Sequence, residues 1–590
     1  MKYIQKAGLG VFIAALFAFI SVLFLGNYEV TDAGLAQLSP QIKESHREMF
    51  LEELAQLKGR KFDSKFSFLG AVSSVIQLTN ERVKQQYGLS EETIEGFIAA
   101  AVKGDDRSQR VSQQSYDQAV ALVGDNMRET VLAYTNWLVG QSAGSEAELR
   151  QKVSDALTGA INGYAGNFSV SEYDAQDYLF SMAKIMAGGI YWENQFLFFL
   201  LIIVAGTVGA LVWIFPAFFD GLPGIKHNGI YHQSATSRGL VGILAGIFLV
   251  GFYILLYFKH AYIAEWISLA DPVSGFLRNG AAADRWFMYG FLYTISILVM
   301  GIRMFAKYRH SNYHKIRTAS VIFFQTAFAF LIPQVLHNLN LPEQDLKNMW
   351  PLDYSFFFDY RLNTFTSTQT GIWMMVWGII LLAIGVPVLT YFFGKRWYCS
   401  WVCGCGGLAE TLGDPYRQLS SKKLVSWQIE RYLIHGVLVF VVAMTGMVLY
   451  TYFTGQSTIL GFNSYSVRGM YGFAIGSIFA GVIGTGFYPL MGNRVWCRFG
   501  CPLAAYLGIV QRFKSRFRIT TNGGQCISCG NCSTYCEMGI DVRAYAQRGQ
   551  NIVRSSCVGC GVCAAVCPRG VLALENGDND NSSRMSEVLY

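Results

Sequence analysis

The chain has 590 residues, of which 52% are hydrophobic and only 15% are charged, and its formal net charge is +7. The apolar residues gather in long runs, and about twenty apolar residues are enough to cross a bilayer. This composition excludes a wholly water-soluble protein and gives no sign of nucleic-acid binding. All thirteen cysteines follow residue 398, which excludes a disulfide framework in the N-terminal half.

Residues 7–26 form the first apolar run. A cleaved signal peptide is the alternative interpretation. However, the run is long for a signal core, and it ends without a convincing Ala-x-Ala cleavage site. We therefore predict a retained membrane anchor over residues 1–26.

Residues 27–192 are predicted to form a soluble, all-helical domain. Apolar residues recur there at helical spacing in six segments, which are residues 41–58, 65–87, 90–103, 113–139, 145–163 and 172–188. The stretch contains one histidine, His46, no cysteine and no glycine-rich phosphate loop. The sequence therefore assigns this domain no chemistry.

Seven further apolar spans bring the predicted total to eight. They lie at about residues 194–219, 239–258, 286–305, 318–337, 372–393, 433–452 and 472–491. We divide this part of the chain into four segments. These are spans two to five at 193–337, spans six to eight at 338–515, a cysteine-rich domain at 516–572, and a polar, disordered tail at 573–590.

Lysine and arginine gather in alternate loops. The basic positions are Lys2, Lys6, Lys226, Arg238, residues 307–317, 395–396, 422–423, Arg494 and residues 514–518. The opposite loops, 259–285, 338–371 and 453–471, are poorer in both residues. The positive-inside rule then places both termini in the cytoplasm of a bacterial inner membrane and residues 27–192 outside it. The cysteines come to lie in the reducing compartment, where clustered thiols suit metal ligation.

A sequence repeat carries two cysteine pairs. The segment GKRWYCSWVCGC, residues 394–405, resembles GNRVWCRFGCPL, residues 492–503, and the paired cysteines are 98 residues apart. If each Cys-x3-Cys motif is helical, its two sulfurs face the same side. The repeat then offers four thiolates for an iron–sulfur or zinc site, which are Cys399, Cys403, Cys497 and Cys501. A redox dithiol couple and simple packing are the alternatives, and Cys405 is a fifth thiol that is either spare or an alternate ligand.

Two cysteine runs follow near the end of the chain, over residues 526–536 and 557–567, and Pro568 closes the second run. In each run, three thiolates at two-residue gaps suit one iron–sulfur cube, and in two-cluster ferredoxins the fourth ligand comes from the other run. We therefore assign one [4Fe–4S] cluster to Cys526, Cys529, Cys532 and Cys567. The second cluster is assigned to Cys557, Cys560, Cys563 and Cys536.

Zinc is the alternative metal, because Cys-x2-Cys pairs also bind it. Eight cysteines at this spacing favour iron–sulfur clusters. Glu537 stands where proline is usual after the first run, which affects the following turn and adds negative charge near one cluster.

The two membrane motifs, followed by a two-cluster tail, resemble the membrane polyferredoxin family over about residues 372–570. That family includes the membrane ferredoxin of periplasmic nitrate reductase systems and the nitrous-oxide-reduction regulator. The cytochrome oxidase assembly ferredoxin is a more distant relative. The resemblance implies electron transfer between the quinone pool or cytoplasmic donors and extracytoplasmic redox partners, with membrane quinone as a candidate bound molecule.

The chain departs from this family in two places. Gly404 replaces a proline in the first membrane motif, and Cys405 is additional. The regulator's flavin-attachment motif is absent, because its nearest match, residues 158–161, ends in isoleucine instead of threonine. The sequence therefore predicts no covalently bound flavin.

Several polar residues at span ends are weaker candidates. His435, His260 and His337 are predicted to be interfacial instead of haem ligands. The outer-loop residues Trp350, Asp353, Asp359 and Arg361 suit either a quinol headgroup pocket or interfacial anchoring. Glu410, Asp414 and Arg417 follow the first motif at helical spacing. We predict that they form a solvated face, and the alternative is salt bridges or contacts around a metal site.

We predict a mainly α-helical, polytopic membrane protein with an extracytoplasmic helical domain and a cytoplasmic two-[4Fe–4S] ferredoxin-like domain. Its predicted function is electron transfer between cytoplasmic or quinone-pool donors and a membrane or extracytoplasmic redox partner. Two alternatives are a redox protein of cofactor maturation or regulation and a structural iron–sulfur subunit of a larger respiratory complex. The sequence identifies no catalytic residue.

Overall fold

The computed structural model describes residues 2–102, 110–219 and 238–577. The chain divides into two compact units. Unit 1 comprises Met1–Ile20, Phe196–Phe258 and Trp266–Tyr590, and unit 2 comprises Ser21–Gln195 and Lys259–Glu265. The predicted basic residue Lys226 lies outside the described residues, as does the end of the chain from residue 578.

Eight helices among the described residues are long and apolar enough to cross a membrane, as the sequence predicts, and the chain is a membrane protein. They are Tyr3–Phe24, Gln195–Ile214, Leu240–Phe258, Arg285–Lys307, Asn312–Asn338, Gln369–Phe393, Leu424–Thr454 and Ser464–Gly486. The fifth, seventh and eighth helices begin before their predicted apolar runs, because each helix includes more polar residues ahead of its apolar segment.

Spans 2, 5, 6 and 8 each contain a π-helical stretch, and the other four are α-helical over most of their length. In chain order, the elements of the spans are α1 (Lys2–Ser21); α11 (Gln195–Phe199), η4 (Leu200–Val204) and α12 (Ala205–Ile214); α13 (Leu240–Phe258); α16 (Arg285–Lys307); α17 (Asn312–Phe323), η8 (Phe324–Leu331) and α18 (Ile332–Asn338); α20 (Gln369–Ile380), η9 (Leu381–Gly385) and α21 (Val386–Phe393); α24 (Leu424–Thr454); and α25 (Ser464–Tyr471), η11 (Gly472–Ile483) and α26 (Gly484–Gly486).

Shorter elements connect the spans of unit 1. They are α15 (Asp271–Leu277), α19 (Asp359–Thr366), α22 (Arg396–Cys399), α23 (Gly404–Glu410), α27 (Tyr488–Met491), α28 (Val495–Phe499), α29 (Pro502–Lys514) and the strands β4 (Thr458–Ile459) and β5 (Phe462–Asn463). The 3-10 helices of the chain include η1 (Val22–Phe24), η2 (Ser39–Gln41), η3 (Asn136–Leu138), η5 (Phe215–Phe218), η7 (His260–Ile263), η10 (Asp414–Leu419) and η12 (Gly523–Gln525). Helix α14 (Ala264–Ser268) runs across the boundary between the units.

The cysteine-rich domain at the end of unit 1 is built on a two-stranded antiparallel sheet. Strand β6 (Phe517–Thr521) pairs with β7 (Leu572–Asn576), so that Phe517 faces Asn576 and Thr521 faces Leu572. Between them lie α30 (Asn531–Thr534), α31 (Val542–Gln547) and α32 (Val562–Ala565). The prediction that disorder begins at residue 573 is wrong, because pairing with β6 orders the chain up to Asn576.

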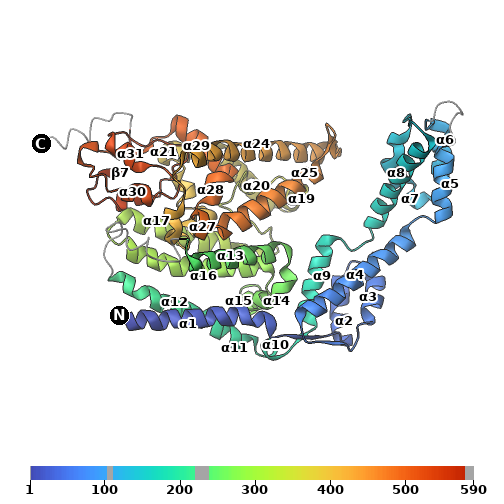
Figure 1. Cartoon of the computed structure of the whole chain (residues 1–590), viewed down its shortest axis with the longest axis horizontal. Coiled ribbons are helices and arrows are strands. Elements are labelled where there is room, and N and C mark those ends of the chain that lie inside the picture. The colour runs from blue at the N-terminus through green and yellow to red at the C-terminus, as the bar shows by residue number, and fades with distance from the viewer. Residues whose placement is uncertain (1, 103–109, 220–237, 578–590) are drawn as a thin grey trace. The chain divides into compact units, whose positions relative to one another are not determined.

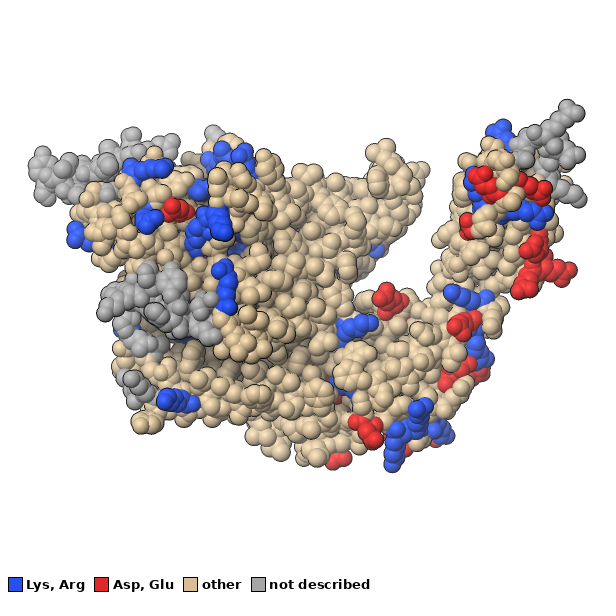
Figure 2. Space-filling model, in the orientation of Figure 1, with Lys and Arg blue, Asp and Glu red and all other residues tan. Residues whose placement is uncertain are grey.

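In Figure 1 the long helices α1, α13, α16 and α24 of unit 1 run in roughly the same direction, and α30, α31 and β7 lie at one end of them. On the face of unit 1 shown in Figure 2, the side chains over the long helices are almost all uncharged. Lysine and arginine gather instead at the end that holds α30, α31 and β7.

Unit 2 is mostly helical, whereas the sequence predicted an all-helical domain. Its helices are α2 (Asp32–Leu38), α3 (Arg47–Ala55), α4 (Lys65–Tyr87), α5 (Glu91–Val102), α6 (Gln113–Ala121), α7 (Asp125–Thr135), α8 (Glu146–Gly166), α9 (Glu172–Ile185) and α10 (Ile190–Glu193). The predicted segment 113–139 is two helices instead of one, because the chain is extended at Gly124, the N-cap of α7. Unit 2 also contains a small sheet that the sequence did not indicate, with strands β1 (Asn27–Glu29), β2 (Lys61–Phe62) and β3 (Ala187–Gly188) in the order β2-β1-β3.

The segment Lys259–Glu265 also belongs to unit 2, although the sequence placed it among the spans. The carboxylate of Glu265 is buried and forms an ion pair with Lys65. It also accepts a hydrogen bond of 2.7 Å from the Tyr28 hydroxyl, and the Glu265 carbonyl accepts one of 2.7 Å from Tyr191. These bonds attach the segment to the N-terminal domain, and burial lowers the pKa of Lys65 despite the facing carboxylate.

Candidate metal centres

The structure brings the first predicted ligand set together in the cysteine-rich domain. Its four cysteines line one small cavity, to which each run contributes, and they are Cys526, Cys529, Cys532 and Cys567. The second set lines a separate cavity and likewise draws on both runs, and it consists of Cys536, Cys557, Cys560 and Cys563. The chain therefore crosses between the two cavities in the way a two-cluster ferredoxin requires.

Both runs use the same backbone turn to direct their cysteines. Gly530 (φ +81°) precedes α30, and Gly561 (φ +79°) precedes α32. Glycine adopts this left-handed conformation without the steric cost that a Cβ would add. The third cysteine of each run, Cys532 or Cys563, then lies in the first turn of a short helix.

The second run is fixed to the membrane part of unit 1. Three side chains donate hydrogen bonds to its carbonyls at residues 557–559: Gln511 at 2.9 Å, Ser400 at 2.8 Å and Tyr313 at 2.7 Å. Arg317 also donates to the Cys560 carbonyl. The second cavity therefore adjoins the spans.

The membrane cysteines do not lie in continuous helices, so the prediction that each motif is helical is wrong. Cys399 ends α22 and Cys403 is the N-cap of α23, whereas Cys497 lies in α28 and Cys501 is the N-cap of α29. In the second motif, Pro502 favours extended backbone at the residue before it and starts a new helix. In the first motif, the backbone is extended at Cys403, and α23 begins at the next residue.

The repeat is nonetheless visible in the structure. Gly394 ends α21 with φ +65°, and Gly492 ends α27 with φ +95°. In the second motif, the backbone N–H of Ala504 also donates to the Cys501 thiol at 3.4 Å. An amide at a helix start stabilises negative charge on sulfur, so this motif presents a thiol suited to metal binding.

These four cysteines are buried together in one apolar cluster of unit 1. Burial raises the pKa of Cys399 to about 12, and it also raises the pKa of Cys497 although Arg494 opposes the shift. Thiols in such surroundings are protonated and inert unless a metal ion binds and deprotonates them. Cys405 packs against the same cluster. The structure thus gathers five thiols at this site.

The spacing of the thiols is wider than zinc requires. With Zn–S bonds of about 2.3 Å, a tetrahedral zinc ion brings its sulfurs to within about 4 Å of one another. Among the described residues, which include all thirteen cysteines, the only three candidate ligand atoms within 4.8 Å of one another belong to Glu410, Glu537 and Cys560. No three thiols of the described residues therefore lie within 4.8 Å of one another.

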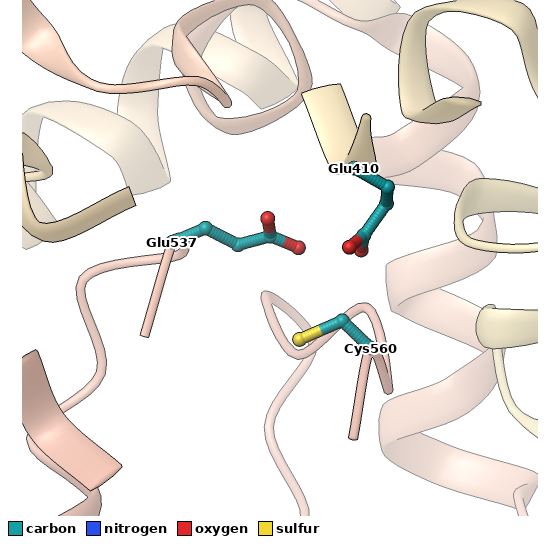
Figure 3. Close-up of side chains that lie close together, drawn as sticks. All are labelled: Glu410, Glu537 and Cys560. Carbon is teal, nitrogen blue, oxygen red and sulfur yellow. The ribbon is translucent and has the colours of Figure 1, made fainter. Parts of the chain in front are cut away.

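That group of three is itself better explained as part of an ion-pair network. Figure 3 shows the carboxylates of Glu410 and Glu537 pointing toward each other, with the Cys560 sulfur beside them. Arg417 pairs with Glu410 and lies 2.6 Å from Glu537, while Arg494 lies 2.7 Å from Glu410 and 3.1 Å from Glu537. The guanidinium groups already supply the positive charge that a metal ion would bring.

Two further contacts complete the balance of charge. Arg317 lies 3.1 Å from Glu410, and Arg417 also pairs with Asp414 at 2.8 Å. Burial raises the pKa of Glu410, but the three guanidinium groups outweigh this effect and hold it well below its usual range. For Glu537 burial prevails, and its pKa is raised. The prediction that Glu410, Asp414 and Arg417 form a solvated face is wrong, because all three are buried.

Arg494 connects two of the thiol sites. Its Nη1 lies 3.6 Å from the Cys497 sulfur and 3.0 Å from the Cys399 carbonyl oxygen. The same side chain pairs with Glu537, which follows Cys536 of the second ligand set. From the sequence, Arg494 was expected only as a loop charge, although it occupies the same place in the repeat as Arg396.

An apolar cavity of about 450 Å³ lies among spans 1 to 4 of unit 1. Its lining is almost entirely aliphatic and aromatic, and its few polar side chains are Thr207, Tyr253, Tyr289, Tyr293, Ser296 and Thr485. The hydroxyl of Tyr293 lies 2.8 Å from the Gly404 carbonyl oxygen, between Cys403 and Cys405. Gln325, in the π-helical stretch η8, donates to the Val402 carbonyl at 2.7 Å. The cavity wall therefore holds the backbone of the first membrane motif.

The other sequence candidates do not come together. His435 lies 2.6 Å from the Arg431 carbonyl oxygen, His337 lies 2.6 Å from Glu343, and His260 belongs to unit 2. This arrangement gives no facing pair of haem ligands among these three.

In the loop of residues 338–371, side chains suggested for a quinol pocket bind one another or neighbouring elements. Arg361 lies 3.3 Å from Asp353, Arg468 lies 2.5 Å from Asp359, and Trp350 donates to Thr445. None of the four suggested residues lines the apolar cavity.

Comparison with known proteins agrees with the sites. Residues 510–572 match the 4Fe-4S dicluster domain family, and residues 375–424 and 471–520 each match a 4Fe-4S binding domain family. Each of the two latter matches contains one membrane Cys-x3-Cys pair. The chain therefore carries ferredoxin-like 4Fe-4S domains of the kind found in electron transport.

The chain is 27% identical over 173 residues to YccM of Escherichia coli (strain K12), which is described as a candidate electron transport protein. The match covers 28% of this chain and 47% of YccM, so the chain spans about half the length of that relative. No solved structure matches the chain.

Proposed function

We propose that this protein transfers electrons between a redox partner of its C-terminal domain and a quinone in the membrane. The proposal rests on contacts that connect the sites. Arg494 pairs with Glu537, which follows Cys536 of the second thiol set, and it also lies beside the Cys497 sulfur. Tyr293, in the wall of the apolar cavity, donates to the Gly404 carbonyl of the first membrane motif. Clusters held by such cysteines exchange single electrons.

Two [4Fe–4S] clusters are proposed at the eight cysteines of residues 526–567, and a third iron–sulfur centre is proposed at Cys399, Cys403, Cys497 and Cys501. The buried apolar surroundings, the N–H group of Ala504 beside Cys501 and the spacing of the thiols support this assignment over zinc, a free dithiol couple or simple packing.

The quinone is proposed to occupy the cavity among spans 1 to 4. Its volume of about 450 Å³ lies within the range of small-molecule sites, and its apolar wall suits an isoprenoid compound that partitions into lipid. The hydroxyl groups of Tyr253 and Tyr289 lie 3.4 Å apart in the cavity wall, and a hydroxyl group suits the carbonyl oxygen of a quinone ring. This location replaces the outer loop as the candidate quinone site.

The proposed topology places both termini in the cytoplasm of a bacterial inner membrane and residues 27–192 on its other side. Eight spans, an even number, return the chain to the side from which it started. Basic residues near Arg317, Arg396 and Arg494 lie at the same end of the spans as the cysteine-rich domain, as the positive-inside rule requires. The extracytoplasmic domain is then available to a periplasmic redox partner.

The experiment compares the wild-type protein with a Cys399→Ser, Cys497→Ser double variant, both purified without oxygen. Transfer is measured in both directions, with decylubiquinol as reductant and with decylubiquinone as oxidant of the dithionite-reduced protein. We expect the double variant to keep the EPR signals of the two C-terminal clusters and to lose their exchange with quinone. Unchanged exchange in the double variant would contradict the proposal.

A further inference from the structure

Cys529 is the only exposed cysteine of the thirteen, all of which lie in the described residues. Its companions in the first ligand set are half-buried or buried, and the membrane pairs are fully buried. Electron transfer rates fall steeply with distance, so a soluble partner must approach one of the thiol sites closely. The edge of the first cavity at Cys529 is the place where the described structure allows this approach.

Two arginines flank this edge. Arg543, in α31, and Arg569, in the turn after Cys567, line the same cavity as Cys529, and both are exposed. A Cβ built on Gly530, the residue after Cys529, would lie 4.0 Å from Arg543 Nη1. The guanidinium group therefore lies near Gly530, the neighbour of Cys529 in the chain.

The loop that carries Cys529 is fixed and partly apolar. Ile527 lines the cavity and is 58% exposed, so it offers an apolar contact beside Cys529. Ser528 has φ +58°, and its hydroxyl accepts a hydrogen bond of 2.6 Å from Gln547 of α31. The edge thus presents a preformed surface with an apolar centre and a basic border.

The surrounding domain is strongly basic. Residues 510–577 contain eight lysines and arginines and three acidic residues. Of the acidic residues, Glu537 is buried among arginines, and Asp541 accepts a hydrogen bond of 2.8 Å from Ser533. Figure 2 shows blue side chains gathered on this end of unit 1. Such a surface attracts acidic partners and speeds their association.

We propose that Ile527, Cys529, Arg543 and Arg569 form the docking edge for a soluble one-electron carrier with an acidic surface. This inference rests on the proposed electron-transfer function and adds the place and the chemistry of the partner. Carboxylates of the carrier pair with the two arginines, and its apolar contact covers Ile527. One electron then passes between the carrier and the protein, so that one is oxidised as the other is reduced, with no bond made and no proton moved.

The test follows reduction of the full-length protein by a photoreduced plant-type ferredoxin, an acidic one-electron carrier, at several salt concentrations. We expect the Arg543→Glu, Arg569→Glu variant to lower the second-order rate constant at low salt by about tenfold or more and to flatten its salt dependence. Arg512→Glu is the matched control, because Arg512 is exposed in the same domain but does not line the cavity. It should change the rate constant by less than about twofold.

Two readings separate failure of this inference from failure of the proposed function. If dithionite reduces the clusters normally but the double variant and the control react with ferredoxin at equal rates, the docking edge is wrong and the electron-transfer function stands. If the purified protein shows no reducible iron–sulfur signal, the function itself is wrong. An Ile527→Asp variant gives a second check, and it should slow ferredoxin while leaving reduction by dithionite unchanged.

Discussion

Arg494 Nη1 lies 3.6 Å from the sulfur of Cys497, inside a buried network that also contains Glu410 and Glu537. Hydrogen bonds and positive charge near a ligand sulfur stabilise the reduced, more negative state of an iron–sulfur centre. Arg494 therefore lies beside the membrane thiol site and also pairs with Glu537, which follows Cys536 of the second ligand set. It is a positioning residue with a measurable electrostatic effect.

Replacing Arg494 should lower the reduction potential of the membrane centre. We expect a fall of roughly 60 mV in Arg494→Gln, which is a tenfold change in a one-electron equilibrium constant. Arg494→Lys keeps the charge but loses the planar group, so its shift should be smaller. An EPR-monitored redox titration measures both values. Arg498→Lys, in the same helix but paired with Glu430, is the control, and equal potentials in all four proteins would contradict this role.

Removing the carboxylate of Glu410 should destabilise unit 1. Glu410→Gln removes the buried negative charge that pairs with the guanidinium groups of Arg317, Arg417 and Arg494. Breaking a buried ion pair in this way lowers the free energy of unfolding by about 3–5 kcal/mol. Thermal loss of the cluster absorbance in detergent measures the effect. Glu148→Gln removes an exposed helix pair with Lys152 and should change the midpoint little, so similar losses in both variants would refute the buried network.

Filling the apolar cavity should block quinone without harming the clusters. Ala210 lines the cavity, and Ala210→Phe places a ring in the proposed quinone volume. We expect a rise of about tenfold or more in the apparent KM for decylubiquinol, equivalent to about 1.4 kcal/mol of binding. Tyr257→Phe is the control, because Tyr257 belongs to span 3 but does not line the cavity. If Ala210→Phe keeps the wild-type KM, quinone binds elsewhere.

The stability of unit 2 should fall in mild acid because of His46. Burial lowers the pKa of His46, whose ring lies 2.9 Å from the Tyr178 hydroxyl and 3.0 Å from the Phe168 carbonyl oxygen. Above about pH 6.5 the imidazole is neutral in both the folded and the unfolded chain, so it adds no pH dependence. Below that, the unfolded chain binds a proton that the folded domain does not, and stability is lost as the pH falls toward the lowered pKa.

Hydrogen exchange of α3 and α9 in the full-length protein measures this effect at about pH 7.5 and about pH 5.5, after correction for intrinsic exchange rates. His46→Gln should reduce the difference between the two conditions. If the variant and the wild type lose protection equally in acid, another group is responsible.

Patterns that depend on local spacing were readable from the sequence. The apolar runs predicted the eight spans, because membrane helices require about twenty apolar residues wherever they occur. The cysteine spacing also predicted which thiols surround each of the two cavities, since Cys-x2-Cys runs share one backbone turn.

Features that depend on contacts between distant parts of the chain could not be predicted from the sequence. Glu410 and Arg417 have a polar pattern typical of an exposed helix face, yet Glu537 and Arg494, far along the chain, bury them. The membrane motifs were predicted as helices from their i, i+4 spacing, and the break before Pro502 shows that a local proline signal outweighs this spacing. The cavity near Tyr293 combines residues from several spans, and no single segment carries a motif for it.

The central claim is that the membrane cysteines hold an iron–sulfur centre in addition to the two clusters of the C-terminal domain. Iron and sulfide analysis of the anaerobically purified protein, combined with EPR of its reduced form, tests this claim most directly. The account predicts roughly twelve iron atoms per chain if the third centre is also a cube, and a signal that is lost in the Cys399→Ser, Cys497→Ser variant. About eight iron atoms with both C-terminal clusters fully occupied, and no signal lost in that variant, would contradict it.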